Sequence, residues 1–359
     1  MDITRYYIGF NRVNGIGPAR LDRLIGYFGS VEAAWHASAG ELQATGLEPK
    51  LISALLTERR TLDLDAELEQ LVRVGAHAIC REDPAYPVAL AQIALAPPVI
   101  YVRGQLRPGD AWSVGVVGTR SPTIYGKEAA RTICEGLVIS GVTIVSGLAL
   151  GIDAVAHHAA IAQGGRTVAV LPAGVDQVYP ERHQRLAQQI IEAGALVSEF
   201  PLGQRPLPAL FPVRNRLISG LARGVVVIEA GAQSGALITV NYALDQGRDV
   251  FAVPGSIFSN QSRGTNQLLR RGAVPVTSAA DVLDGLDFGR VVLRDELNSA
   301  TSSDPVEAAL LQILEHEPMH LDDLCRGVEL PVAVVGAAMS MLEIKGQVRA
   351  CGVAVYVRV

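Results

Sequence analysis

The fold is decided by the stretch Val114-Gly-Val-Val-Gly118-Thr-Arg-Ser121. A short apolar run ends in glycine and then in polar residues, which predicts a buried strand, a Gly-rich turn and a helix. Val142-Thr-Ile-Val-Ser146-Gly-Leu-Ala-Leu-Gly151-Ile-Asp153 repeats the pattern further along the chain. Turns of this kind present backbone amides at a helix start, where anions bind. Neither loop carries the Lys-Ser/Thr pair of a P-loop or a clean dinucleotide-binding fingerprint.

Further apolar runs follow, separated by helical stretches. All the runs together cover residues 114–117, 142–145, 167–171, 195–198, 224–229 and 249–253. Strands that are apolar throughout are buried on both faces, as in a parallel sheet covered by helices. We therefore predict an α/β domain with a doubly wound, mostly parallel sheet. Its loops at the carboxyl ends of the strands would line one crevice.

The N-terminal segment reads as a separate helical domain. Gly15-Ile-Gly17 precedes a helix with Leu21, Leu24, Ile25 and Phe28 on one face, and Thr45–Ile52 is a weaker copy. This pattern resembles a helix-hairpin-helix or SAM-like domain, whose amides can hold a DNA phosphate. A plain helical bundle that needs the glycines only for tight turns fits the same residues.

The C-terminal segment follows the plan of a winged helix: three helices and a hairpin around Cys351-Gly352. The expected third helix, from Pro331 to Ile344, is almost uncharged. A helix that reads DNA carries Arg, Lys, Asn or Gln, so a protein contact is favoured. The predicted divisions are 1–78 (helical), 79–290 (Rossmann-like), 291–305 (polar linker) and 306–359 (winged helix).

Composition restricts the classes of function. The 359 residues are 49% hydrophobic and 19% charged, which is ample for folded cores. We expect no membrane span and no signal peptide, and hence a cytoplasmic protein. The scattered cysteines (Cys80, Cys134, Cys325 and Cys351) indicate reduced, mostly buried thiols, and we expect no metal and no cofactor. The net charge of −5 disfavours nucleic acid mildly, although a local arginine cluster can still bind phosphates.

The first loop supplies the main candidate site. Gly118 lets a ligand approach the backbone, Thr119 and Ser121 offer hydroxyls, and Arg120 offers a fork that matches a phosphate. The alternative is an Arg120 paired with a nearby carboxylate.

In the second loop, Ser146 and Gly147 end the strand and Asp153 either caps the next helix or orients Arg120. His157 and His158 face different directions on that helix, so we interpret them as packing groups rather than metal ligands.

Two further segments extend the candidate site. Phe211 precedes Arg214, Asn215 and Arg216 at a helix start, and an aromatic beside cationic forks suits single-stranded nucleic acid. One arginine would reach a phosphate while the other pairs with an acid such as Glu229, and Phe211 could instead be plain core. Ser234, Gly235 and Thr239 follow another strand, where the hydroxyls either bind an anion or cap a helix.

These segments in order resemble the DprA (Smf) family, the DNA-processing proteins of bacterial natural transformation. The resemblance covers about residues 80–285. It rests on Asp83–Pro87, Gly118–Arg120, Ser146–Asp153, Val170–Asp176, Tyr179-Pro180, Ser198–Pro201, Phe211–Leu221, Glu229–Gly235, Val253–Gly255 and Asn266–Ala273. So many motifs in one order are far more specific than a lone glycine motif.

The resemblance implies an extended Rossmann-like domain that dimerises and binds single-stranded DNA. It also implies that the protein protects the strand and loads RecA recombinase without catalysis. The family's Gly-Ser/Thr-Arg pocket falls on Gly118, Thr119 and Arg120, and its second glycine loop falls on Ser146, Gly147 and Asp153. Its Arg-Asn-Arg helix falls on residues 214–216. The family's basic track ahead of the aromatic is reduced here to Arg205.

Two other classes of function compete with this interpretation. The same fold resembles nucleoside-monophosphate phosphoribohydrolases, but the helix turn after Gly235 lacks their catalytic carboxylate. A sequence-specific regulator acting through the C-terminal domain is disfavoured by the uncharged third helix and the acidic net charge.

Overall fold

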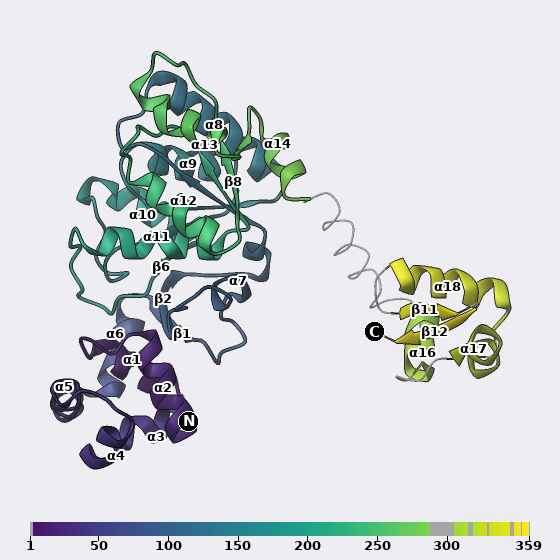
Figure 1. The fold of residues 1–359 in the computed structure, drawn as a ribbon, viewed down its shortest axis with the longest axis horizontal. Helices are drawn as coiled ribbons and strands as arrows, with labels where there is room; N and C mark the ends of the chain where they lie inside the picture. Colours follow the sequence, from purple (N-terminus) through teal and green to yellow (C-terminus); the bar gives the residue numbers. More distant parts are fainter. Residues whose placement is uncertain are drawn as a thin grey trace. The chain divides into compact units, whose positions relative to one another are not determined.

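The computed structural model describes residues 3–287, 305–314, 319–328, 330–344, 348–352 and 354–358. The chain divides into two compact units, Met1–Leu286 and Asp287–Val359 (Figure 1). The predicted linker, residues 291–305, lies outside the described residues except for Pro305.

The first unit begins with six helices, in the segment that was predicted to be helical. They are α1 (Thr4–Arg12), α2 (Pro18–Phe28), α3 (Val31–His36), α4 (Ala39–Ala44), α5 (Pro49–Thr61) and α6 (Leu64–Arg73). Leu21 and Leu24 of α2 are buried, as their spacing predicts. The helices share one apolar core with Val99 and Tyr101 of the sheet. Helices and sheet therefore belong to one unit.

A nine-stranded sheet forms the rest of this unit, in the order β1-β2-β6-β5-β4-β3-β7-β8-β9. The strands are β1 (Ala76–Cys80), β2 (Val99–Gly104), β3 (Ser113–Val117), β4 (Thr143–Ser146), β5 (Thr167–Val170), β6 (Ala195–Ser198), β7 (Gly224–Val227), β8 (Asp249–Ala252) and β9 (Val274–Pro275). Pairing is parallel from β6 to β9 and antiparallel at β1 and β2. The predicted Rossmann-like, mostly parallel sheet is confirmed. Strand β1 spans the boundary placed at residue 78, so the sheet begins earlier in the chain than the apolar runs indicated.

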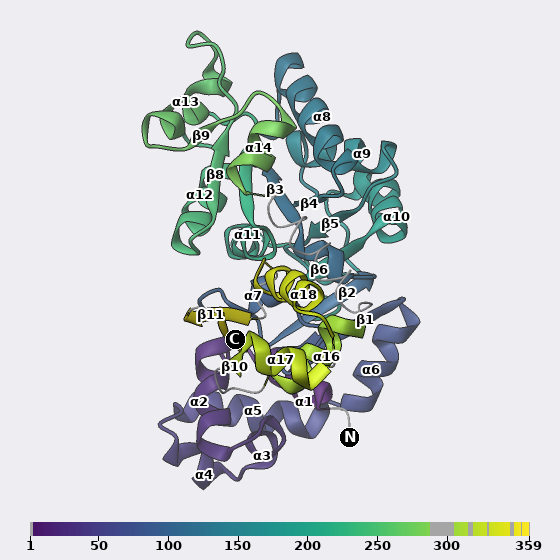
Figure 2. The ribbon, with the colours of Figure 1, turned by 90° about the vertical axis from the view of Figure 1, so that its right-hand side faces the viewer.

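Helices cover both faces of the strands. Figure 2 shows α8 (Ile124–Ile139), α9 (Ile152–Ala162) and α10 (Gln184–Ala193) on one side, and α11 (Leu210–Leu221) and α12 (Ala236–Asp245) on the other. Neighbouring residues of β5 enter different cores: Val168 packs with α11 and α12, whereas Ala169 packs with α10. Burial on both faces explains why the strands are apolar throughout. The shorter elements are α7 (Val88–Ala91), α13 (Arg263–Arg270), α14 (Ala279–Gly285), η1 (Pro108–Ala111), η2 (Glu181–His183) and η3 (Asn260–Ser262).

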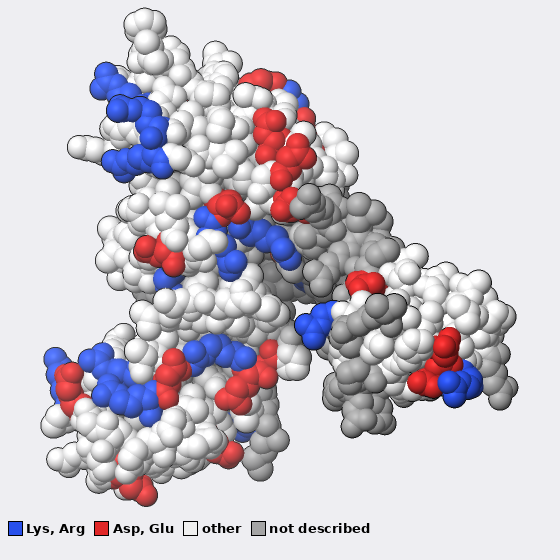
Figure 3. Space-filling model, turned by 45° about the vertical axis from the view of Figure 1, so that its right-hand side comes forward, with Lys and Arg blue, Asp and Glu red and all other residues white. Residues whose placement is uncertain are grey.

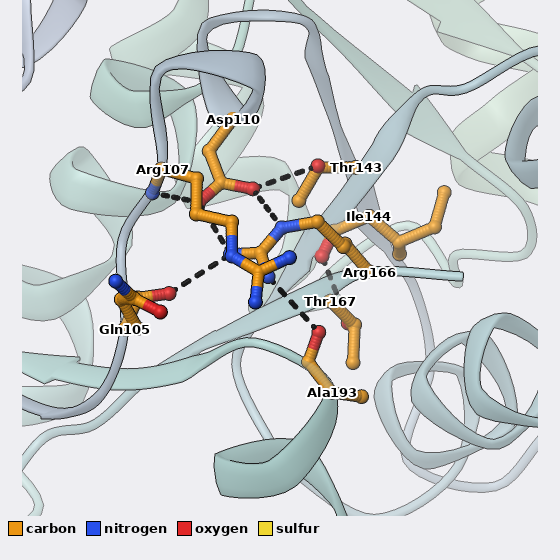
Figure 4. A network of polar contacts seen from close by, with 8 residues as sticks. All are labelled: Gln105, Arg107, Asp110, Thr143, Ile144, Arg166, Thr167 and Ala193. Carbon is orange, nitrogen blue, oxygen red and sulfur yellow. Dashed lines mark hydrogen bonds and ion pairs between the residues drawn. The ribbon is translucent and has the colours of Figure 1, made fainter. Parts of the chain in front are cut away.

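Polar side chains at the amino ends of β4 and β5 form a network of hydrogen bonds (Figure 4). Arg166 donates to both carboxylate oxygens of Asp110 at 2.7 Å, and also to the carbonyl of Gln105 at 2.8 Å. Asp110 also accepts from the Thr143 hydroxyl at 2.9 Å and from the Arg107 amide at 2.8 Å. Because these groups satisfy one another, this edge of the sheet offers little to an anionic ligand.

The second unit is a winged helix, as the sequence predicts. It comprises α16 (Pro305–Ile313), β10 (Met319–His320), α17 (Leu321–Val328), α18 (Val332–Ile344), β11 (Val348–Gly352) and β12 (Val355–Arg358). Met319 and His320 form a third strand, which pairs with β12. Leu310, Leu324, Val335 and Leu342 contribute to its core.

The sequence predicted no membrane span in either unit. In the described ranges no single helix is long and apolar enough to cross a membrane; α17 and α18 reach that length only together, across a bend of 111°.

Cys80, Cys134 and Cys325 are free, and the first two are buried. The side chain of Cys351 lies outside the described residues.

Candidate nucleic-acid interface

The carboxyl edge of the sheet contains a pocket of about 610 Å³. The loops after β3, β4, β5 and β7 meet there with the first turns of α11 and α12, as expected for an open parallel sheet. Its predicted lining residues are Gly118, Arg120, Asp153, Phe211, Arg214, Asn215, Ser234, Gly235 and Thr239. The remaining lining residues are Val117, Ala149, Tyr179, Pro208, Pro212, Ile218, Ala236 and Ile238.

A cation and two aromatic rings occupy the mouth of this pocket. The Arg120 guanidinium lies 5.4 Å from the centroid of the Phe211 ring, within cation–π range. The Tyr179 ring meets Phe211 edge to face, with 5.8 Å between centroids and 79° between planes. Arg120 is exposed, and in the described residues no carboxylate forms an ion pair with it. The guanidinium is therefore available to a ligand.

Tyr179 was missed as a site residue by the sequence reasoning. It lies in the loop after β5, two residues before η2. The available signal was its position at the carboxyl edge, beside the Pro180 that ends the same motif. Its partner Phe211 comes from another element, so the aromatic pair depends on tertiary packing.

Gly118 is required by close packing where β3 ends. A Cβ atom at this position would lie 2.6 Å from the Ile152 side chain and 3.0 Å from the Glu229 carbonyl oxygen. Thr119 is nearly buried, and its hydroxyl accepts from the Ser121 amide at 3.2 Å. Gly118 and Thr119 thus hold the turn that presents Arg120, and the ligand-facing group is the arginine.

Arg214 has a different role from the one expected, because its guanidinium is buried rather than exposed. It donates to the Gly147 carbonyl at 2.6 Å and to the Val170 carbonyl, joining the ends of β4 and β5. Burial lowers the pKa of Arg214 to about 10, and the charge of Asp153 opposes this shift. The side chain lines the inner wall of the pocket and fixes two loops.

Asp153 neither caps its helix nor orients Arg120. Its carboxylate accepts from the amides of Gly147 at 3.2 Å and Ala149 at 3.3 Å, and helix α9 begins after Gly151 without a side-chain cap. Burial raises the pKa of Asp153, whereas the nearby Arg214 charge lowers it. Asp153 and Arg214 are therefore two buried groups of opposite charge that each bind the backbone of the loop after β4.

Arg216 forms the ion pair that was expected in this helix, but with a different acid. It pairs with Glu199, and it donates to the Leu95 carbonyl at 2.8 Å. Glu229 instead accepts from the Thr123 amide at 2.9 Å and the Thr123 hydroxyl at 2.6 Å, at the start of α8. Glu229, the acid named as an example, is therefore not the partner of Arg216, because its carboxylate binds Thr123 at the start of α8.

Of five other predicted residues, only Ser234 and Gly235 line the pocket. Ser146 is buried and donates to the Val116 carbonyl at 2.6 Å, so it is structural. Ser121 and Arg205 are exposed outside the pocket lining. The Ser234 hydroxyl accepts from the Ala236 amide at 3.3 Å, and Gly235 begins α12 without a side-chain cap. The amides of Ala236, Leu237 and Ile238 in this first turn all have acceptors within the protein, so Arg120 remains the ligand-facing group of the pocket.

A mostly parallel α/β sheet with a pocket at its carboxyl edge places the protein in the class of Rossmann-like folds. Comparison with protein families narrows this class. Residues 77–287 match the family DNA recombination-mediator protein A, and residues 295–352 match the DprA winged helix domain. The chain belongs to the DprA/Smf family, as its motifs predict.

Relatives and solved structures agree with this assignment. Protein Smf of Escherichia coli is 39% identical over 322 residues, covering 88% of this chain and 86% of that protein. DNA processing protein DprA of Streptococcus pneumoniae is 43% identical over 206 residues, covering 57% and 73%. Its X-ray structure matches with a TM-score of 0.69 and 34% identity, covering 79% of this chain and 98% of that one.

A second solved structure concerns the single-stranded DNA binding mode of DNA processing protein A from Helicobacter pylori. It matches with a TM-score of 0.53 and 29% identity, covering 59% of this chain and 95% of that one.

Proposed function

We propose that this protein binds single-stranded DNA in the pocket at the carboxyl edge of the sheet. The observation that carries the proposal is the exposed Arg120 guanidinium beside the Phe211 ring, without a carboxylate partner in the described residues. The cation suits a phosphate, and the ring suits the face of a base. The likeness to a relative studied for its single-stranded DNA binding supports the same conclusion.

The size and polarity of the pocket support a nucleotide of the strand as occupant. A volume of about 610 Å³ lies within the range of small-molecule sites. Two arginines and one carboxylate are among its lining residues, and that carboxylate is bound by two backbone amides.

We also propose that the protein performs no catalysis on the bound strand. The first turn of α12 contains no acidic residue, and the carboxylates of Asp153 and Glu229 are occupied by protein donors. No free general acid or base faces the pocket from these positions. Incubation of the purified protein with nucleoside monophosphates should release no free base, whereas release would favour the phosphoribohydrolase alternative.

The remaining parts of the proposal come from the family. We propose that the protein is a cytoplasmic homodimer that protects incoming strands during natural transformation and loads RecA recombinase onto them. Sedimentation of the full chain should give the mass of a dimer. RecA filament formation on strands covered by single-strand binding protein should accelerate when the protein is added.

The decisive experiment replaces Arg120 by alanine. Fluorescence anisotropy with a labelled oligothymidylate should show about a 10- to 100-fold loss of affinity, since a charge-assisted contact is removed. The slope of log affinity against log salt should also flatten by about 0.7 for one lost phosphate contact.

Arg73→Ala is the matched control, because Arg73 is exposed near the end of α6, away from the pocket lining. It should retain affinity, and both variants should retain the melting temperature. Unchanged affinity in a folded Arg120→Ala variant would refute the pocket assignment.

A further inference from the structure

The loop after β8 carries the most exposed aromatic side chain of the described residues. Phe258 is 91% exposed and its neighbour Ile257 is 79% exposed. The loop is held in shape by short-range bonds: the Ser259 amide donates to the Ser256 carbonyl at 3.0 Å, and the Phe258 amide donates to the Ser256 hydroxyl at 3.3 Å. An ordered turn that presents two large apolar side chains to solvent indicates a binding surface.

This loop is continuous with the pocket. Parallel strands place their carboxyl ends at one edge, and β8 follows β3 and β7 in the sheet order, so its loop is next in the row after those that line the pocket. Gln261 donates to the Ser121 carbonyl at 3.1 Å, and the Gly264 amide donates to the Ala230 carbonyl at 2.7 Å. Ser121 follows Arg120 directly in the chain. The loop is thus attached to the two turns that carry the phosphate-facing groups.

Cationic side chains lie beside the same loop. Arg263 begins α13 immediately after η3, and Arg270 ends the helix; both are exposed. In the described residues neither forms an ion pair with a carboxylate. Figure 3 shows Lys and Arg side chains gathered over α13 at this end of the sheet. A ring beside unpaired guanidinium groups is the combination that holds bases and phosphates of a single strand.

We propose that the loop after β8 is a second contact for the strand held in the pocket, with Phe258 stacking on a base and Arg263 pairing with a phosphate. The inference rests on the proposed function and extends it from one nucleotide to a track along the sheet edge. The track runs from Tyr179 and Phe211, past Arg120, to Phe258.

The nature of the contact is tested by a graded series at position 258. Phe258→Ala should weaken binding of a long oligothymidylate about 5-fold or more, the loss expected for one stacked base. Phe258→Trp should restore affinity, and Phe258→Leu should not, because leucine is apolar but has no ring face. Ile139→Ala is the control, since Ile139 is 76% exposed at the end of α8 and lies outside this loop.

Strand length and salt separate the second contact from the first. An oligothymidylate too short to reach beyond the pocket should bind wild type and Phe258→Ala equally. Arg263→Ala should reduce the salt slope for the long strand by about 0.7, and Arg73→Ala should leave it unchanged.

Three outcomes would overturn the second contact. The first is unchanged long-strand affinity in Phe258→Ala and Arg263→Ala. The second is restoration by Phe258→Leu together with a change of oligomeric state in Phe258→Ala, which would assign the loop to a contact between copies of the chain. The third is an equal loss of affinity for short and long strands in Phe258→Ala. Arg120→Ala tells the two proposals apart: if it still weakens binding at every length, the pocket stands and only the second contact fails.

Discussion

Arg166 and Arg120 lie at opposite edges of the same sheet. They differ in how many of their hydrogen-bond donors have acceptors within the protein. Arg166, at the amino end of β5, donates to Asp110 and to the carbonyls of Gln105 and Ala193. Arg120, at the carboxyl end of β3, faces an aromatic ring and solvent. A cation whose donors are used holds the fold together, whereas a cation whose donors are free is available to a ligand.

Arg214 shows that position at the binding edge alone does not make an arginine a ligand contact. It lines the pocket, yet its Nη1 donates to the carbonyls of Gly147 and Val170 and its Nε donates to the Asn215 side chain. In this respect it resembles Arg166 rather than Arg120. Substitutions of the satisfied arginines should therefore change stability, and substitutions of the free groups should change affinity.

The largest effect is expected for Arg214→Met. Its removal takes a donor from two buried carbonyls and a nearby positive charge from Asp153. Each buried polar group left unsatisfied costs about 1–3 kcal/mol of unfolding free energy. Denaturant titration followed by circular dichroism measures this loss. Adding Asp153→Asn to Arg214→Met should recover part of it, because the uncompensated charge is removed. A fully stable single variant with lost DNA affinity would instead show Arg214 to be a direct ligand contact.

Arg166→Ala should have the next largest effect and should separate the two edges. It leaves the mostly buried Asp110 carboxylate without its cation, at a cost of about 2–3 kcal/mol. Affinity for single-stranded DNA at a temperature where the variant is folded should stay within about twofold of wild type.

The control for this prediction is Arg131→Ala, which removes exposed ion pairs to Glu128 and Glu135 and should cost about 0.5 kcal/mol or less. Equal losses in the two variants would mean that the Asp110–Arg166 network does not hold the amino edge.

A third effect concerns pH, through a histidine buried between α9 and the sheet. His157 is fully buried, and its Nδ1 lies 2.7 Å from the Thr167 hydroxyl at the amino end of β5. Burial, with the nearby positive groups of His158, His183 and Arg214, lowers the pKa of His157 to about 3. Below pH about 6.5, the ordinary pKa of histidine, the unfolded chain binds a proton on His157 that the folded chain does not bind. Stability therefore falls as pH falls.

The slope from His157 should approach about 1.4 kcal/mol per pH unit between about pH 5.5 and 4. Comparing wild type with His157→Leu in denaturant titrations across this range isolates the contribution. The variant should have the flatter dependence on pH. Identical slopes would mean that His157 is protonated in the folded protein.

The strands and the edge of the sheet could be predicted from the sequence because they follow from local pattern. Apolar runs on both faces indicate a parallel sheet, and parallel strands place the loops after Val117 and Ser146 at one edge. The glycines at 118 and 151 marked the turns correctly. Gly151 has a positive φ of 82°, and Gly118 is packed against Ile152.

The partners of the charged side chains could not be predicted in this way. Arg214 and Arg216 are two residues apart in the chain, yet one is buried beneath two strands and the other pairs with Glu199. Which of them turns inward depends on how α11 packs on the sheet. The Asp110–Arg166 pair joins residues 56 positions apart, and no local spacing marks it.

The smallest effect is expected at Tyr179, the aromatic that sequence reasoning missed. Its edge packs on Phe211, and a pair of this kind contributes about 0.5–1.5 kcal/mol beyond buried area. Tyr179→Ala should therefore weaken single-strand binding about 2- to 10-fold by loosening the Phe211 ring, and Tyr179→Phe should bind as wild type does.

Tyr27→Ala is the matched control for Tyr179→Ala. Tyr27 also meets a phenylalanine edge to face, at 4.9 Å from Phe28, but it lies in α2 among the N-terminal helices. If the free groups at the carboxyl edge alone bind the strand, this variant keeps full affinity. Equal weakening by Tyr27→Ala and Tyr179→Ala would extend the DNA contact to the N-terminal helices and would contradict the contrast between the two edges of the sheet.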